Sequence, residues 1–276
     1  DLLGALGVNL EIAPEKARRA LDQLGFVFFF APAYHPAFKH IVPVRKALAA
    51  NGLRAVFNIL GRLVNPGRPA HVILGAVSAA AVPTLAGALE VLGAKAGLAV
   101  HGIIAGDRGI DELTTATVNR VQGFGGRRDV TGEWVAEDFG LPRSPFEDLL
   151  GGDLPANLAI VEALLEGRGP RGLVDTIVLN AAVAMWVVGK VPSIREGLAP
   201  ARVVACGPAA RSRAPPHPVG GVARRKGHLY RLAVSDRDDL SDLHLRGPRG
   251  GARDDGQDQQ RASPESHRAR RNRSSV

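Results

Sequence analysis

The chain has 276 residues, of which 45% are hydrophobic and 22% are charged, so it can bury the core of one or two domains. It contains no apolar run of the length and purity that a membrane span requires. Its single cysteine, Cys206, excludes an internal disulfide and a cysteine-rich metal site, and a reducing cytoplasm is the simplest setting for it.

The net charge of +8 belongs almost entirely to the C-terminal tail. From Val204 onward there are 15 Lys and Arg residues against 8 Asp and Glu residues. Residues 1–203 hold 20 Lys and Arg residues against 19 Asp and Glu residues. A nearly neutral body does not favour a polyanionic partner, so we expect no nucleic acid to bind it. A non-enzymatic, nucleic-acid-binding protein stays open as an alternative that only the basic tail favours.

The first 25 residues predict helices. Apolar residues recur at helical spacing over 2–10 and again over 14–24, and Pro14 followed by Glu15 is a typical helix start. Gly25 ends the second helix. We expect residues 1–25 to be the remnant of a small helical domain.

A short, continuous apolar run over 26–30 predicts a strand that is covered on both faces. The next residues include Pro32, Pro36 and Pro43, which restrict the backbone. We therefore expect a stiff loop at the end of this strand, at the edge of the sheet where ligands bind in open parallel sheets.

Two basic side chains in this stretch are candidate ligands. Arg45 presents a planar fork that suits a carboxylate or a phosphate, and His35 could orient an aromatic or amine substrate. Isolated basic residues usually lie on the surface, so on the pattern alone Arg45 and Lys46 are more typical of the start of a solvated helix.

The central part of the chain predicts an α/β fold. Two more buried apolar runs, 72–78 and 97–102, flank an amphipathic helix over 83–92, which is the strand–helix–strand pattern of a parallel sheet. Residues 118–121 and 128–130 predict a smaller hairpin or edge. We therefore expect an α/β domain over 26–203, with a mostly parallel sheet flanked by helices.

The last part of this domain predicts helices. Residues 145–166 are mostly helical in pattern, and 173–188 form one long apolar helix. Its central polar residue, Asn180, is more typical of a buried structural hydrogen bond than of a ligand. Ser193 with Glu196 three residues later is a capping-box pattern that begins another helix.

An adjacent pair of carboxylates, Asp111 and Glu112, follows the strand expected over 97–102. Such oxygen ligands suit Mg²⁺, which takes one or two carboxylates plus substrate phosphates. The pair would equally suit a helix N-terminus, where acidic side chains face the helix dipole.

A turn at 151–153, Gly-Gly-Asp, could offer backbone amides to an anion, but a plain turn with an N-cap is more typical.

Residues 204–276 show no sustained period and are rich in Arg, Gly, Pro, Asp and Ser, so we expect a low-complexity, disordered tail. Alternatively, this stretch is translated in a shifted reading frame, because such a composition is typical of a GC-rich gene read out of frame. The coding DNA would decide between the two, since the true frame would continue the helix that begins at Ser193.

Several segments together resemble one enzyme family. The segments "GFVFFFAPAYHPAFKHIVPVRKAL", "GIDELT", "GGDLPANLAIVEALLEG" and "DTIVLNAAVAMWVVG" occur in the order typical of anthranilate phosphoribosyltransferase. The resemblance covers about residues 1–202. It implies a nucleoside-phosphorylase-type phosphoribosyltransferase fold, a homodimer, and transfer of a phosphoribosyl group from phosphoribosyl pyrophosphate (PRPP) with Mg²⁺ to anthranilate, in tryptophan biosynthesis.

The resemblance also implies roles for particular residues. Arg45 matches the arginine that binds the anthranilate carboxylate, and His35 and Tyr34 match the loop that lines the anthranilate channel. Asp111 and Glu112 match the acidic pair that holds Mg²⁺ on the pyrophosphate.

The chain departs from the family pattern in several places. It has no counterpart of the family's N-terminal GTGGD and KHGNR segments, so we expect this chain by itself not to catalyse the reaction. Arg62 stands where the family has a proline near the acceptor site, and Phe38 replaces a methionine. A nucleoside-phosphorylase-like transferase with another acceptor is an alternative, against which Arg45 argues because it favours a carboxylate.

Overall fold

The computed structural model describes residues 2–53, 57–105 and 108–206, which all belong to the first of two compact units, Asp1–Ser235 and Asp236–Val276. The tail expected over 204–276 lies almost wholly outside the described residues, so its disorder and its reading frame stay predictions. The expected domain boundaries after residues 25 and 203 also stay predictions. Within the described residues, no helix is both long enough and apolar enough to cross a membrane.

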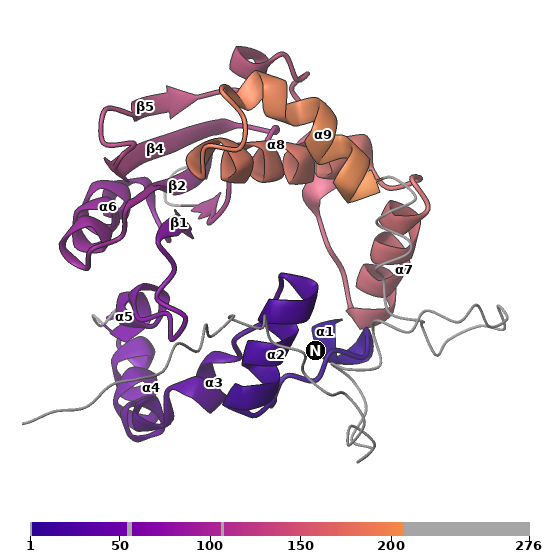
Figure 1. Ribbon diagram of the computed structural model, residues 1–276. Coiled ribbons are helices and arrows are strands. Elements are labelled where there is room, and N and C mark those ends of the chain that lie inside the picture. The colour runs from indigo at the N-terminus through magenta and orange to yellow at the C-terminus, as the bar shows by residue number, and fades with distance from the viewer. Residues whose placement is uncertain (1, 54–56, 106–107, 207–276) are drawn as a thin grey trace, which may run out of the picture. The chain divides into compact units, whose positions relative to one another are not determined.

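The part of the chain before the sheet is helical (Figure 1). The helix predicted over 14–24 is confirmed as α2 (Pro14–Leu24), and it ends on Gly25, whose φ of 68° is left-handed and costs glycine little. The helix expected over 2–10 covers only α1 (Leu2–Ala5). The further helical segments are α3 (Ala31–Tyr34), the 3-10 helix η1 (Pro36–Ile41), α4 (Val42–Ala50) and α5 (Phe57–Leu63).

The strand predicted over 26–30 is wrong. These residues connect α2 to α3 without pairing with any described strand, and Phe26 is 63% exposed. The rings of Phe29 and Tyr34 meet edge-on with centroids 4.9 Å apart, and the Phe29 ring also lies beside Gly67. An apolar run of this length forms a strand only where a partner strand completes its hydrogen bonds.

The stiff loop expected after residue 30 is also wrong. Pro32, Pro36 and Pro43 lie in the first turns of α3, η1 and α4, respectively. A proline costs nothing there, because the first amides of a helix have no partner within the helix. The prolines therefore start three short helical segments instead of stiffening a loop.

The sheet begins with the strand–helix–strand unit that the sequence predicts. Strand β1 (His71–Gly75) pairs in parallel with β2 (Ala96–Ala105), and α6 (Val82–Val91) connects them. The short strand β3 (Arg108–Ile110) pairs antiparallel with β2. The predicted hairpin is confirmed as β4 (Val118–Gly125) and β5 (Thr131–Trp134), but residues 128–130, which the sequence predicts in it, lie in the connection before β5.

The strand order is β1-β2-β4-β5, with β3 beside β2. The α/β class is confirmed, but the mostly parallel sheet is not: of the four described strand pairings only β1–β2 is parallel. Strands β3 and β4 flank β2 and both run antiparallel to it, and the described residues between β3 and β4 form no crossover helix. The result is a mixed, open sheet.

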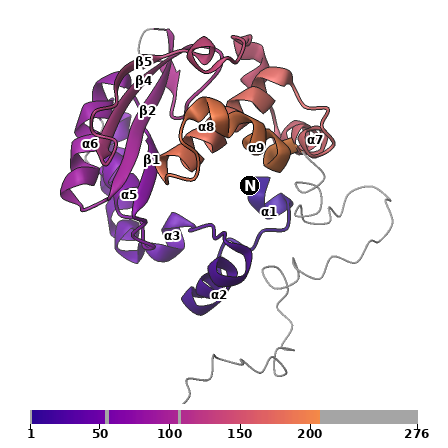
Figure 2. The same ribbon diagram turned by 45° about the horizontal axis from the view of Figure 1, so that its top comes forward.

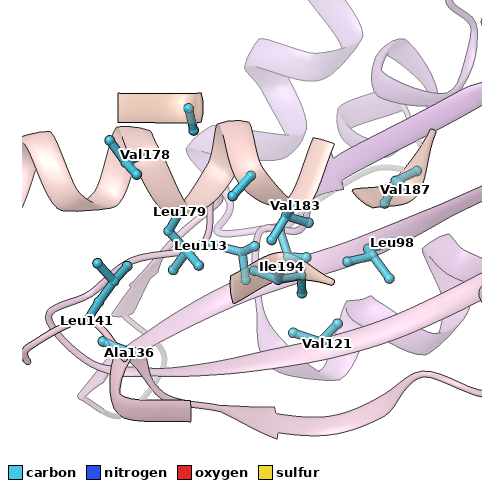
Figure 3. Packing of buried hydrophobic residues seen from close by; sticks show 13 residues of the cluster. Leu98, Leu113, Val121, Ala136, Leu141, Val178, Leu179, Val183, Val187 and Ile194 are labelled. Atoms are coloured by element: carbon cyan, nitrogen blue, oxygen red, sulfur yellow. The ribbon is translucent and has the colours of Figure 1, made fainter. Parts of the chain in front are cut away.

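Helices cover both faces of this sheet. Figure 2 shows α6 on one side of the strands and α8 (Arg171–Val187) on the other. Alternate residues of β2 face the two helices, because side chains along a strand point to opposite faces. Figure 3 shows the core on the α8 side, which includes Leu98, Val121, Val178, Leu179 and Val183. The core on the α6 side includes Leu74, Leu85, Leu89, Ala99 and Phe124.

The helices after the sheet follow the sequence prediction. Helix α7 (Leu154–Leu165) begins at Asp153, whose side chain accepts a 3.0 Å hydrogen bond from the Ala156 amide, so the turn before it is an ordinary N-cap. The long apolar helix is α8. The predicted serine cap is confirmed at the start of α9 (Ile194–Cys206), where Ser193 Oγ accepts from the Glu196 amide. The Glu196 carboxylate accepts from Ser193 Oγ, and not from the Ser193 amide as in a full capping box.

A buried carboxylate ties α9 to α8. The Asp175 side chain is 2% exposed, and it forms ion pairs with Arg202 of α9 and, at 3.7 Å, with Arg171. Beside this contact, Gly197 lets α9 approach α8 closely, since a β-carbon there would lie 3.2 Å from the Ala182 backbone oxygen. Helix α9 is thereby held against α8.

Candidate functional site

A cavity of about 520 Å³ lies at the carboxyl end of β1, whose last residue is Gly75. Polar side chains on its lining come from α5, from the loop after β3 and from α8; they are Arg62, Asp111, Glu112 and Asn180. The remaining lining is formed by Ile73, Leu74, Gly75 and Val100 of the two parallel strands. A hollow beyond the carboxyl ends of parallel strands is the usual place for a ligand in an open α/β sheet.

The acidic pair is placed by a very close backbone contact. Asp111 directly follows β3, and a β-carbon on Gly75 would lie 1.6 Å from the Asp111 backbone oxygen. Only glycine leaves room for the loop to pass over the end of β1. A second close contact supports β3, since a β-carbon on Gly109 would lie 2.0 Å from Nε2 of the buried His101.

The residues after the acidic pair are fixed by two asparagines. Asn119 of β4 is 1% exposed; its Oδ1 accepts from the Thr114 amide at 2.8 Å, and its Nδ2 donates to the Thr114 carbonyl at 2.9 Å. Asn180 donates to the Leu113 carbonyl at 2.8 Å, so the expected structural hydrogen bond is confirmed. The loop is thus held from the sheet and from α8, and the pair is not at a helix N-terminus, the alternative left open above.

Arg62 contacts the acidic pair directly. Its Nη1 donates to Asp111 Oδ2 and to the Gly75 carbonyl, both at 2.8 Å. The two side chains are 36% and 52% exposed, so water screens the pair. Nothing in the sequence signals this contact, because Arg62 and Asp111 lie 49 positions apart, on a helix and a loop without a shared motif.

The electrostatics of the pair suit a cation. Partial burial raises the pKa of Glu112 above its ordinary value, and the neighbouring Asp111 carboxylate raises it further. Ionisation of Glu112 beside the Asp111 carboxylate is therefore disfavoured, and a bound cation would favour it. Arg62 already supplies one positive charge to Asp111.

The donor set is small. Among the described residues, no group of three or more His, Cys, Asp or Glu side chains converges. A cation at Asp111 and Glu112 would take one or two carboxylates from the protein and its remaining ligands from water or substrate. This is the pattern that Mg²⁺ adopts with phosphate substrates.

The predicted acceptor residues lie elsewhere in the helical part and do not line this cavity. The Tyr34 hydroxyl donates to the Ile12 carbonyl at 3.2 Å. The His35 ring packs against Phe38 with centroids 5.3 Å apart, and Arg45 is exposed on α4. The structure therefore brings Asp111 and Glu112 together at the cavity, whereas Arg45, His35 and Tyr34 form no part of its lining.

The chain matches the family model described as "Glycosyl transferase family, a/b domain" over residues 1–210. It is 42% identical over 204 residues to anthranilate phosphoribosyltransferase of Deinococcus radiodurans, which is 74% of this chain and 58% of that protein. The chain thus spans less than two thirds of the length of this curated relative.

Solved structures show the same likeness. The crystal structure of anthranilate phosphoribosyltransferase from Thermus thermophilus aligns with a TM-score of 0.66 and 42% identity, over 75% of this chain and 59% of that one. The yeast enzyme from Saccharomyces cerevisiae in complex with PRPP and Mg aligns with a TM-score of 0.62 at 24% identity, over 74% and 57%, and supports the fold alone.

Proposed function

Because this chain belongs to the glycosyl transferase family with the a/b domain, we propose that it serves the transfer of a phosphoribosyl group from PRPP to anthranilate in tryptophan biosynthesis. The observation that carries the proposal is the 42% identity to an anthranilate phosphoribosyltransferase over 204 residues. The family match over residues 1–210 includes the whole sheet and the residues that line the cavity. The relatives named above all carry this enzyme's name, and no comparable observation favours another acceptor or nucleic acid. A cytoplasmic homodimer that uses Mg²⁺ completes the proposal.

The cavity would hold the departing pyrophosphate. Asp111 and Glu112 would hold Mg²⁺ there, and the bound metal would neutralise the negative charge that grows on the leaving group. Partial burial, and after it the neighbouring Asp111 carboxylate, raises the pKa of Glu112, and this supports the assignment because a cation would stabilise the charged carboxylates. The Gly75–Asp111 contact keeps the pair at the carboxyl end of β1 before any ligand arrives.

The transfer needs positioning more than acid–base chemistry. The anthranilate nitrogen forms a bond to C1 of the ribose, while the C1–oxygen bond to pyrophosphate breaks and its electron pair leaves with the pyrophosphate. The nitrogen then loses one proton. The protein's task is to align a weakly nucleophilic amine with C1 and to stabilise the departing charge.

Arg45 would align the acceptor by binding its carboxylate, with His35 and Tyr34 beside the ring. The Arg45 side chain is exposed and forms no ion pair with any described residue, so its guanidinium is available to a carboxylate from outside. Tyr34 is anchored through its hydroxyl and its ring, which makes it a fixed wall. These roles rest on the family resemblance together with this exposure and anchoring.

We expect Arg45→Gln to weaken anthranilate binding by about tenfold, because a charge-assisted, bidentate contact is replaced by a neutral one. Binding is the suitable test, since the chain spans 58% of its D. radiodurans relative, and anthranilate's own fluorescence reports it. Lys46→Gln, the same charge change on the next residue of α4, is the matched control and should leave the affinity unchanged. Equal losses in both variants, or none in Arg45→Gln, would argue against Arg45 as the carboxylate ligand.

A further inference from the structure

Arg62 holds the position on Asp111 that a cation would take. Its Nη1 lies 2.8 Å from Asp111 Oδ2 and 2.8 Å from the Gly75 carbonyl, so the guanidinium lies between the end of β1 and the acidic loop. Asp111 Oδ2 cannot offer the same lone pairs to a guanidinium and to a metal ion at once. The two positive charges would also repel each other across the carboxylate.

The contact is weak enough to be displaced. The Arg62 and Asp111 side chains are 36% and 52% exposed, and partly exposed ion pairs of this kind contribute little to stability. The Gly75 carbonyl remains as a second acceptor for Arg62, so the guanidinium keeps a hydrogen bond in the cavity when it leaves Asp111. Arg62 is therefore a positive charge attached to the cavity wall that can move on and off the carboxylate.

We propose that Arg62 is a built-in competitor for the cation at Asp111 and sets the cavity's affinity for a divalent ion. This inference rests on the proposed function, because it takes Asp111 as a cation ligand. It assigns to Arg62 a role in regulating the site through Asp111, distinct from any contact with the substrate. Removing the charge should make the site bind a free divalent cation more tightly.

The test compares Mn²⁺ binding by the full chain and by Arg62→Gln, followed through the electron paramagnetic resonance signal of free Mn²⁺. We expect Arg62→Gln to bind Mn²⁺ about three- to tenfold more tightly, because it removes one competing positive charge that water partly screens. Arg128→Gln is the matched control, because it removes the same charge and breaks an exposed 2.8 Å ion pair with Glu90. This pair lies near the β4–β5 turn, at the opposite end of β2 from the cavity. The control should leave the affinity for Mn²⁺ unchanged.

A double variant separates competition at Asp111 from a general charge effect. In an Asp111→Asn background, Arg62→Gln should no longer tighten Mn²⁺ binding, because the shared carboxylate is gone. If the wild type binds Mn²⁺ and Arg62→Gln binds it equally or more weakly, Arg62 is not a competitor, while the cation site stands. If neither protein binds Mn²⁺, the cation site itself fails, and the proposed function loses its support at this cavity.

Discussion

Replacing Gly75 by alanine should destabilise the protein by about 3 kcal/mol or more, because the added carbon has no place to go. It would lie 1.6 Å from the Asp111 backbone oxygen and 2.6 Å from the carbonyl carbon. The obstacle is backbone, so no side-chain rotation relieves it; either the end of β1 or the acidic loop must shift. Urea unfolding gives the free energy, and Mn²⁺ binding should fall with it.

Gly87→Ala is the matched control for this substitution. Gly87 lies within α6, and a β-carbon there would meet nothing within 4 Å. The change should stabilise the protein by about 1 kcal/mol, since alanine is the better helix former. If Gly75→Ala were as stable as the wild type, the loop would not pass over the end of β1 as described.

Removing both carboxylates, in Asp111→Asn/Glu112→Gln, should weaken Mn²⁺ binding by about 100-fold or more. Both oxygen ligands that the chain offers are replaced by neutral amides, and loss of supporting residues alone often costs 10–100-fold at metal sites. The fold should survive, because the variant removes a carboxylate whose charge is disfavoured by partial burial and by the neighbouring Asp111, the two causes that raise the pKa of Glu112. Isothermal titration with Mn²⁺ measures the loss.

The control for this variant carries the same two changes elsewhere. Asp129→Asn/Glu133→Gln replaces two exposed acids of the β4–β5 hairpin, neither of which lines the cavity. It alters the net charge by the same amount and should bind Mn²⁺ like the wild type. An equal loss in both double variants would show that net charge, and not the acidic pair, governs binding.

The sequence predicts well those helices and strands that are determined by residues close together in the chain. The β1–α6–β2 unit, the helix α8 and the serine cap at Ser193 follow from periodicity and from hydrogen bonds between near neighbours. The run 26–30 has the same composition as a buried strand, yet it lacks a partner to pair with, and pairing is a long-range property. The antiparallel direction of β4 is set by its pairing with β2, which no local pattern reports.

The site was predictable only in part. Asp111 and Glu112 are visible as an acidic pair near a strand end, and the family resemblance gives them a role. Their approach to Gly75 depends on a tertiary contact between residues 36 positions apart, which no local pattern reports. Arg62 stood out in the sequence as a departure from the family's proline, but its ion pair with Asp111 appears only when α5 and the loop are placed in space.

The most direct test of this account is diffraction from crystals of the full chain soaked with Mn²⁺ and PRPP, using the anomalous signal of manganese. We expect a manganese peak bonded to carboxylate oxygens of Asp111 and Glu112, with the pyrophosphate on that ion and the Arg62 guanidinium moved off Asp111. Manganese and PRPP bound elsewhere, with Arg62 still paired to Asp111 as at present, would contradict the assignment of this cavity to phosphoribosyl transfer.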